Sequence, residues 1–194
     1  MKQEMVELNR YVCYIGRPSY QKNVLFFVDV ANEVHRFHPE VKFLLLGVGY
    51  YSPDLAAVQA MISKYHLEDV VELQPWLTHA ETLEYVRNSL LYLTVSRYEG
   101  LPLAVLEAMS LGKCIVASDV VGNRDCVCDG YNGRLLPLEK DVFAKSLSEL
   151  IEDDTQRCKY GENSRKLFEE KFLIEKRIND LENTYRQIVD SQIA

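Results

Sequence analysis

Two glutamates set eight positions apart are the residues of this sequence best suited to chemistry. Glu99 and Glu107 delimit the segment EGLPLAVLE, and Glu107 stands inside an apolar run. Burying a carboxylate costs free energy unless hydrogen-bond donors or a cation satisfy it. The hydroxyl groups of a ribose would supply such donors. The alternative is that Glu107 pairs with a structural arginine or lysine and that Glu99, in a loop, is solvated.

The residues between the two glutamates add backbone donors. Gly100 lacks a side chain, so the main chain can approach a ligand closely there. A helix is predicted to begin shortly afterwards, and its first N–H groups, for instance those of Leu103 and Ala104, have no partner within the helix. Phosphate groups bind well at such helix amino termini.

Arg17 and Lys22 are two cations that follow the first predicted strand. A cation near the start of a helix is unfavourable, because the helix dipole is positive there. An anion between the two residues would remove that conflict, since a guanidinium grips phosphate oxygens in two places and an ammonium adds a point charge. The alternative is that both are ordinary solvated surface charges.

Several other motifs carry less information. Gly47 and Gly49 lack the third glycine of the dinucleotide-binding fingerprint, and the sequence contains no phosphate-binding G-x-x-x-x-G-K-[ST] loop. Trp76 is either a flat surface for a base or ordinary packing, and we favour packing for a lone tryptophan. The histidines show no metal-ligand spacing and are interpreted as surface or core residues; they are His35, His38, His66 and His79.

Composition limits the class of protein. The 194 residues are 47% hydrophobic and 26% charged with a net charge of −7, which indicates one soluble globular domain and argues against a nucleic-acid partner. No apolar run is long enough to cross a bilayer and the first residues lack a signal-peptide core, so we expect a cytoplasmic location. The five cysteines are expected to be reduced, small apolar residues.

Short apolar segments alternate with segments of helical periodicity. The predicted strands are residues 11–16, 41–47, 70–73, 90–95 and 114–117, with a possible sixth at 133–136. The predicted helices are residues 23–37, 55–65, 78–88 and 102–111, followed by helical, charged segments from 139 onward. The pattern predicts an α/β fold, a Rossmann-like doubly wound parallel sheet of about six strands with helices on both faces. Ligands bind beyond the carboxyl ends of such strands, where the residues discussed above would converge.

The segment SRYEGLPLAVLEAMSLGKCIVASDVVGNRDCVCDGYNGRLLP resembles the donor site of family 4 glycosyltransferases, which have the GT-B fold. The likeness rests on the E-x7-E pair, on the closing D-G-x-N-G and on an earlier G-R-x-x-x-x-K, here Gly16, Arg17 and Lys22. It covers roughly residues 11–150.

The resemblance implies a role for each residue. Arg17 and Lys22 would hold the diphosphate beside Gly16, Glu107 would bind the ribose hydroxyls, and Glu99 would face the transferred sugar. Backbone groups of Gly100, Leu101, Leu103 and Ala104 would complete the sugar and phosphate contacts, and the loop containing Trp76 and Leu77 would lie beside the base. Such enzymes retain the anomeric configuration and need no metal or other cofactor; Glu99, Arg17 and Lys22 would be the catalytic residues.

The resemblance also implies a missing partner domain. Family members have two domains, and residues 1–194 correspond to the carboxy-terminal, nucleotide-sugar-binding domain, with a core at about 11–150 and a helical tail at about 151–194. An apolar stripe on residues 173–189 needs a surface to cover, either this sheet or another domain. The resemblance implies that it covers the absent amino-terminal domain, which binds the acceptor.

The predicted activity is transfer of a hexosyl group from a nucleotide-diphosphate sugar, a UDP-sugar by family frequency, to a glycan or lipid-linked acceptor in cell-surface polysaccharide synthesis. The whole enzyme would make at most peripheral contact with a membrane. The alternatives are half of a sugar-nucleotide epimerase and a non-catalytic binding module with the same fold.

Overall fold

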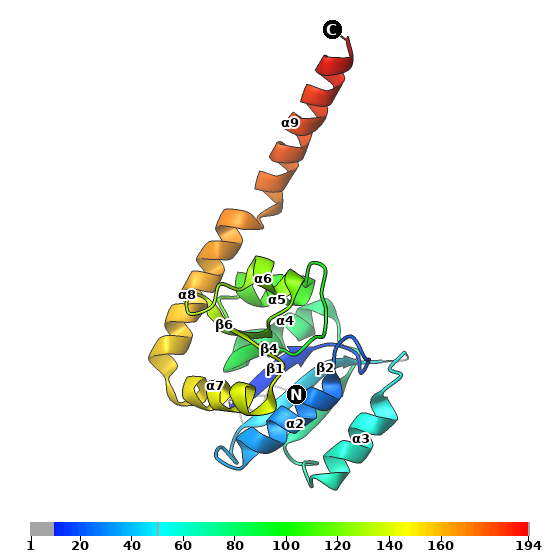
Figure 1. Cartoon of the computed structure of the whole chain (residues 1–194), viewed down its shortest axis with the longest axis vertical. Helices are drawn as coiled ribbons and strands as arrows, with labels where there is room; N and C mark the ends of the chain where they lie inside the picture. The colour runs from blue at the N-terminus through cyan, green and yellow to red at the C-terminus, as the bar shows by residue number, and fades with distance from the viewer. Residues whose placement is uncertain (1–9, 50, 194) are drawn as a thin grey trace.

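Parallel strands in the order β3-β2-β1-β4-β5-β6 form the centre of the molecule (Figure 1). The computed structural model describes residues 10–49 and 51–193. The predicted doubly wound α/β fold is confirmed, and each predicted strand lies within two residues of an observed one. The strands are β1 (Tyr11–Ile15), β2 (Lys42–Val48), β3 (Val71–Pro75), β4 (Leu91–Thr94), β5 (Ile115–Ser118) and β6 (Gly133–Leu136).

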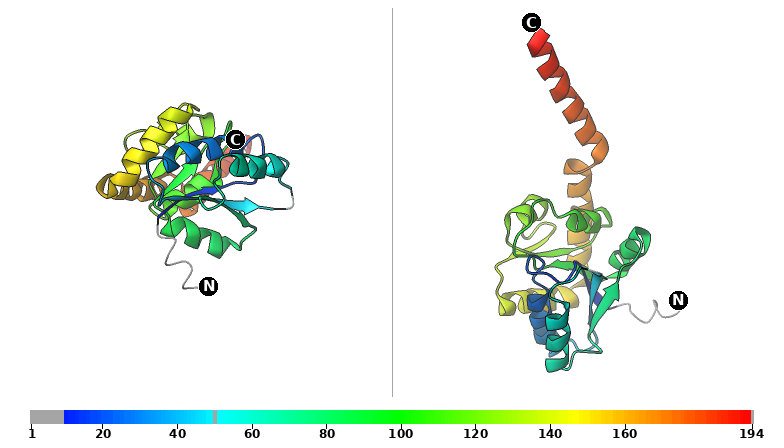
Figure 2. Two further views of the ribbon diagram at one scale, coloured as in Figure 1. Left: turned by 90° about the horizontal axis from the view of Figure 1, so that it is seen from below. Right: turned by 90° about the vertical axis from the view of Figure 1, so that its right-hand side faces the viewer.

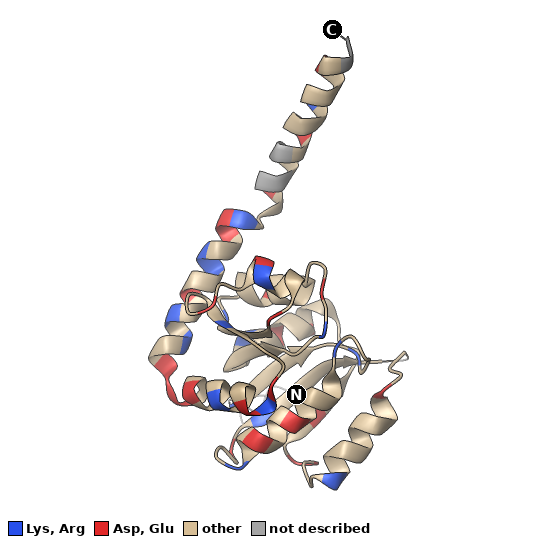
Figure 3. Ribbon diagram, in the orientation of Figure 1, with Lys and Arg blue, Asp and Glu red and all other residues tan. Residues whose placement is uncertain are grey.

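Both faces of the sheet are buried. Successive side chains of β1 point to opposite faces, so Val12 and Tyr14 join one apolar cluster while Tyr11 and Cys13 join the other. Charged residues lie mostly on helices and loops, and the strands are largely free of them (Figure 3). A sheet covered on both faces needs apolar side chains at nearly every strand position, which explains the short, continuously apolar strand sequences.

Helices cover the two faces in two groups (Figure 2). One face carries α2 (Val24–His35), α3 (Leu55–Lys64) and α7 (Lys140–Glu152). The other carries α4 (His79–Asn88), α5 (Leu103–Ser110), α6 (Val121–Cys126) and α8 (Asp154–Lys171).

The last helix, α9 (Ile174–Ile193), projects away from the rest of the domain (Figures 1 and 2). Its apolar stripe is exposed in this structure; the side chains concerned are Ile174, Ile178, Leu181, Tyr185 and Ile188. The predicted helix is confirmed, and the surface that the stripe covers stays a prediction. Among the described residues, no helix is both long and apolar enough to span a membrane.

The segment after β5, for which the sequence predicted no element, forms the short helix α6, in which Gly122 lies directly against the backbone of Glu99 and Gly100. One local prediction was wrong. Lys22 was expected at the start of a helix. Instead α2 begins after Asn23. The backbone of Asn23 is left-handed, with a φ of +54°, and so cannot be part of the helix. Lys22 therefore belongs to the preceding turn.

A glycine sets the spacing between α5 and α8. A Cβ atom added to Gly161 on α8 would lie only 2.1 Å from the carbonyl oxygen of Gly112, which follows α5. Only a residue without a side chain allows this contact.

We therefore expect Gly161→Ala to destabilise the protein by about 1–3 kcal/mol, although alanine normally favours a helix over glycine. Urea unfolding monitored by circular dichroism would measure the change. Glu162→Ala, at the exposed neighbouring position, is the control and should be near neutral. A Gly161→Ala protein as stable as the wild type would show that α8 can shift to admit a methyl group.

Candidate functional site

The sheet reverses its strand order between β1 and β4, and most of the predicted site residues lie beside that reversal. β1 pairs with β2 on one side and with β4 on the other, so the loops after β1 and β4 lead in opposite directions. Such a switch point leaves a crevice at the carboxyl ends of the strands. Gly16 and Arg17 leave β1 there, and Glu99 lies in the loop that follows β4.

An ion pair joins the two loops. Lys22 Nζ lies 2.7 Å from Glu99 Oε1, and the side chains are 23% and 7% exposed respectively. The alternative that Glu99 is a solvated loop residue is therefore wrong. In this structure the partner of Lys22 is the protein's own carboxylate, because the switch point brings together residues that are 77 positions apart. An anion bound between Arg17 and Lys22 stays a prediction.

Buried hydrogen bonds fix the turn that carries Lys22. The hydroxyl of Tyr14 donates to the carbonyl oxygen of Lys22 at 2.7 Å, and burial raises the pKa of Tyr14 well above its usual value, so the hydroxyl stays protonated. The amide of Asn23 donates to the carbonyl oxygen of Val95 at 3.2 Å. Tyr14 lies on β1 and Val95 at the end of β4, so these two hydrogen bonds fix the backbone of the turn that carries the Lys22 ammonium group.

The loop that carries Glu99 is held from two sides. The N–H of Gly122 donates to the carbonyl oxygen of Glu99 at 3.2 Å, and a Cβ atom on Gly122 would lie 2.2 Å from the carbonyl oxygen of Gly100. From the other side, the N–H of Arg97 donates to the carbonyl oxygen of Gln21 at 2.8 Å. The side-chain amide of Gln21 donates to the carbonyl oxygen of Tyr98 at 3.3 Å.

Arg17 is a solvent-exposed cation of this region. Its guanidinium lies 5.2 Å from the centre of the exposed Tyr51 ring, and Gly16 anchors the turn by donating its N–H to the carbonyl oxygen of Leu46 at 2.9 Å. Gly16 also packs against Lys22, because a Cβ atom there would lie 3.2 Å from Lys22 Cγ. Arg17 and Lys22 thus follow the same strand, one exposed and one paired.

Glu107 has a different partner from the one expected. Its Oε1 lies 2.9 Å from His79 Nε2, and the two side chains are 35% and 70% exposed. The alternative that Glu107 pairs with a structural arginine or lysine is wrong, because its partner is His79; its binding of ribose hydroxyls stays a prediction. The interpretation of His79 as an unremarkable surface residue missed this contact; its place directly after β3 was the available signal.

Trp76 lies open to solvent, with 78% of its surface exposed, so the favoured interpretation as ordinary packing is wrong. Its indole lies against Gly49, where a Cβ atom would come within 1.6 Å of Nε1. Leu77 is half-buried against the core cluster beneath α4 and α5. The loop therefore has an anchored end and an exposed aromatic end.

The start of α5 is accessible at the same end of the sheet, beyond the carboxyl ends of the strands. A Cβ atom on Gly100 would meet nothing within 4 Å, and the side chains of Leu101 and Leu103 are exposed while that of Ala104 is half-buried. Pro102 precedes the helix, which begins at Leu103 without a side-chain cap. The backbone donors predicted here are thus open to a ligand.

Metal-ligand groups are not apparent in the region. Among the described residues, no cluster of three or more His, Cys, Asp or Glu side chains has an arrangement that could hold a metal ion. The arrangement instead offers cations, carboxylates and free backbone N–H groups, which suit a ligand that carries both phosphate and hydroxyl groups.

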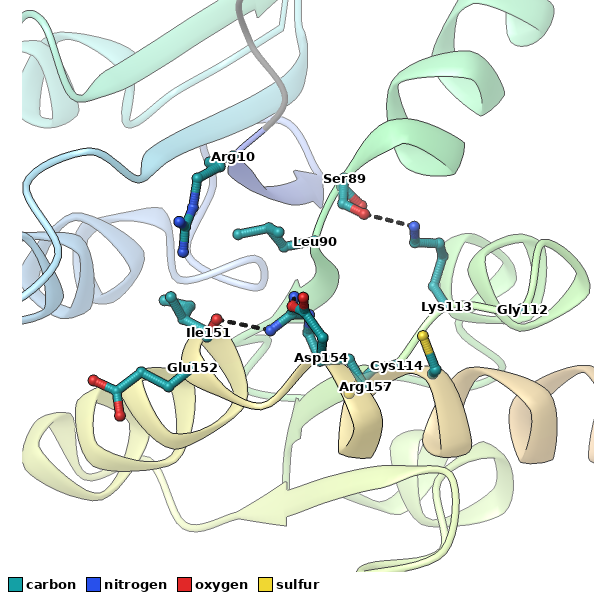
Figure 4. Close-up of a pocket in the computed structure, with 11 residues that line it drawn as sticks. Arg10, Ser89, Leu90, Gly112, Lys113, Cys114, Ile151, Glu152, Asp154 and Arg157 are labelled. Atoms are coloured by element: carbon teal, nitrogen blue, oxygen red, sulfur yellow. Dashed lines mark hydrogen bonds and ion pairs between the residues drawn. The ribbon is translucent and has the colours of Figure 1, made fainter.

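A separate pocket opens at the opposite end of the sheet, at the amino ends of the strands (Figure 4). Lys113 Nζ donates to the carbonyl oxygens of Arg87 and Ser89 at 2.8 and 2.5 Å, and burial lowers the pKa of Lys113. Arg157 donates to the carbonyl oxygen of Ile151 at 2.8 Å. These cations satisfy carbonyl groups at the ends of α4 and α7, so we interpret them as structural.

The sequence matches the family described as glycosyl transferases group 1 over residues 2–167. The chain belongs to this family. It is 28% identical over 178 residues to alpha-D-kanosaminyltransferase from Streptomyces kanamyceticus, covering 91% of this chain and 45% of that protein. It is also 28% identical to UDP-Gal:alpha-D-GlcNAc-diphosphoundecaprenol alpha-1,3-galactosyltransferase from Escherichia coli, covering 90% and 45%.

Solved structures agree with this assignment. Staphylococcus aureus TarM, in a complex that includes UDP, superposes with a TM-score of 0.82 and 26% identity, covering 90% of this chain and 35% of that one. This glycosyl transferase chain therefore spans about half the length, or less, of the relatives that it matches. The resemblance drawn from the sequence motifs is confirmed at the level of family and fold, and the residue roles remain predictions.

The Lys22–Glu99 pair in this glycosyl transferase should couple the two side chains energetically. We expect a double-mutant cycle of Lys22→Met and Glu99→Gln to give a coupling energy of about 1–2 kcal/mol. Glu99 is nearly buried, so removing either partner leaves the other without its ion pair. Urea unfolding of the four proteins would measure it. Lys42 and Glu72, a more exposed pair at 3.1 Å, provide the comparison cycle and should couple by less. Additive effects of the two site substitutions would contradict a stabilising pair.

Proposed function

We propose that the chain is the donor-binding half of a retaining glycosyltransferase that takes a nucleotide-diphosphate sugar. The observation that carries this proposal is the Lys22–Glu99 ion pair at the switch point, with the exposed Arg17 on the same loop as Lys22 and α5 following Glu99 in the chain. Cations, a sugar-compatible carboxylate and the first N–H groups of a helix thus follow the carboxyl ends of two neighbouring strands.

The diphosphate would lie between Arg17 and the amino end of α5. Arg17 is exposed, so its guanidinium is free to grip phosphate oxygens in two places. Lys22 retains 23% side-chain exposure and can share its charge between Glu99 and a phosphate. As the sugar bond breaks, the leaving diphosphate gains negative charge, which these fixed positive groups would stabilise.

The nucleoside would lie toward α4. Glu107 would accept hydrogen bonds from the ribose hydroxyls, and the loop at Trp76 and Leu77 would lie beside the base. UDP is the proposed nucleotide, because the S. aureus TarM structure contains UDP and the E. coli relative is named for a UDP-sugar.

Glu99 would face the hydroxyls of the transferred hexosyl group. The acceptor, a glycan or lipid-linked sugar of cell-surface polysaccharide synthesis, would be bound by the second half that the relatives' greater length accommodates. Transfer would proceed with retention and without a metal. The chemistry would take place in the cytoplasm.

Two other functions fit the same fold less well. Half of a sugar-nucleotide epimerase would bind a nucleotide sugar but would not need Arg17, Lys22 and both glutamates together. A non-catalytic module would keep the fold without ligand affinity, so nucleotide binding separates it from the proposed function.

Calorimetric titration with UDP, GDP, ADP and NAD, in the presence of a chelator, tests the proposal. We expect one diphosphate nucleotide to bind, and Lys22→Ala to weaken it by about 1.5–3 kcal/mol through loss of a charge-assisted contact. Lys64→Ala, an exposed lysine on α3, is the control and should not change the affinity. Equal affinity of Lys22→Ala and wild type would remove Lys22 from the site, and no binding of any nucleotide would favour the non-catalytic module.

Sugar transfer should need the acceptor-binding half. We expect the 194-residue chain to produce no glycosylated product from a UDP-sugar and a lipid-linked acceptor, because catalysis depends on holding both reactants in one geometry. Chromatography of a radiolabelled donor reaction would measure this. Turnover by this chain alone would contradict the assignment as half of an enzyme.

A further inference from the structure

His79 occupies a fixed position at the start of α4. Thr78 caps the helix: its hydroxyl oxygen accepts from the N–H of Glu81, and the Glu81 carboxylate accepts from the N–H of Thr78 at 2.8 Å. This reciprocal capping box holds the first helical turn in place. His79 is the first residue of that turn, so its backbone is set although its ring is exposed.

The imidazole reaches from α4 to α5 and holds one oxygen of Glu107. Nε2 lies 2.9 Å from Oε1, while Oε2 has no hydrogen-bond partner among the described residues. A carboxylate turns broadly about its last torsion unless something fixes it. With Oε1 held, Oε2 keeps a defined direction, and each oxygen still has lone pairs for further donors.

An exposed pair of this kind contributes little to folding. His79 also lies two residues beyond Leu77, in the segment that leads from the exposed Trp76 into α4. It therefore links the loop next to the proposed base position with the carboxylate next to the proposed ribose position.

We propose that His79 is a positioning residue that aligns Glu107 with the ribose hydroxyls and so makes the site selective for ribonucleotides over 2′-deoxyribonucleotides. This inference rests on the proposed donor-binding function. His79 would act through Glu107 and would contact neither the sugar bond that breaks nor the diphosphate.

The test compares the affinities for UDP and for 2′-deoxy-UDP, measured by calorimetry with the 194-residue chain. Wild type should prefer UDP by about tenfold to a hundredfold, the range for one charge-assisted hydrogen bond. His79→Ala should reduce that preference by about fivefold, because UDP offers Glu107 two hydroxyl donors and 2′-deoxy-UDP only one, so UDP binding weakens more. His79→Gln should retain most of the preference, because its amide can still donate to Glu107.

Matched variants separate the possible outcomes. His66→Asn removes another exposed histidine, at a position whose φ of +56° asparagine tolerates, and should leave the preference intact. A ribose preference that Glu107→Gln abolishes but His79→Ala preserves would overturn this inference and leave the proposed function standing. Should another diphosphate nucleotide bind in place of UDP, the same comparison uses that nucleotide and its 2′-deoxy form; failure of wild type to bind any of UDP, GDP and ADP would overturn both. Equal weakening of both nucleotides by His79→Ala would assign His79 a general structural role and also overturn the inference.

Discussion

The pairing of β1 with β4 is the constraint on which the site depends. A parallel sheet buried on both faces admits few polar groups along its strands, so the polar side chains collect at the strand ends. At the reversal of strand order, the chain leaving β1 and the chain leaving β4 turn away from each other. The ion pair between Lys22 and Glu99, at 2.7 Å, joins these two chain segments. Hydrogen bonds of the buried Tyr14 and Asn23 side chains fix the turn that carries the lysine.

The ion pair gives the crevice a particular electrostatic character. In this structure the positive charge of Lys22 is largely offset by Glu99, which leaves Arg17 as the more available charge for an anion. If a diphosphate drew Lys22 away, the nearly buried carboxylate of Glu99 would need other donors. The hydroxyl groups of a sugar attached to the same diphosphate would provide them. On the proposed function, the two parts of the donor would thus favour each other's binding.

The sequence predicts the strands, and it predicts that the site lies at their carboxyl ends, because both follow from local periodicity and from the rules of parallel sheets. The sequence does not predict contacts between distant residues. A solvated Glu99 was the alternative considered for this loop residue, and its burial depends on Gly122 and Lys22, which no local pattern brings near it. Glu107 was expected to be partly shielded because its sequence neighbours are apolar, and its side chain is 35% exposed. The contact with His79 depends on the packing of α4 against α5, which periodicity does not specify.

The exposed groups at this edge indicate that the sheet supplies one wall of a site. Trp76, Leu101 and Leu103 are large apolar side chains with more than half of their surface open to water. Exposed apolar side chains that form a contiguous patch are typical of surfaces that another body covers. Transfer of a sugar also requires that water be kept from the reacting centre. On the proposed function, the residues described here would hold the donor, and a second surface placed over them would exclude the water.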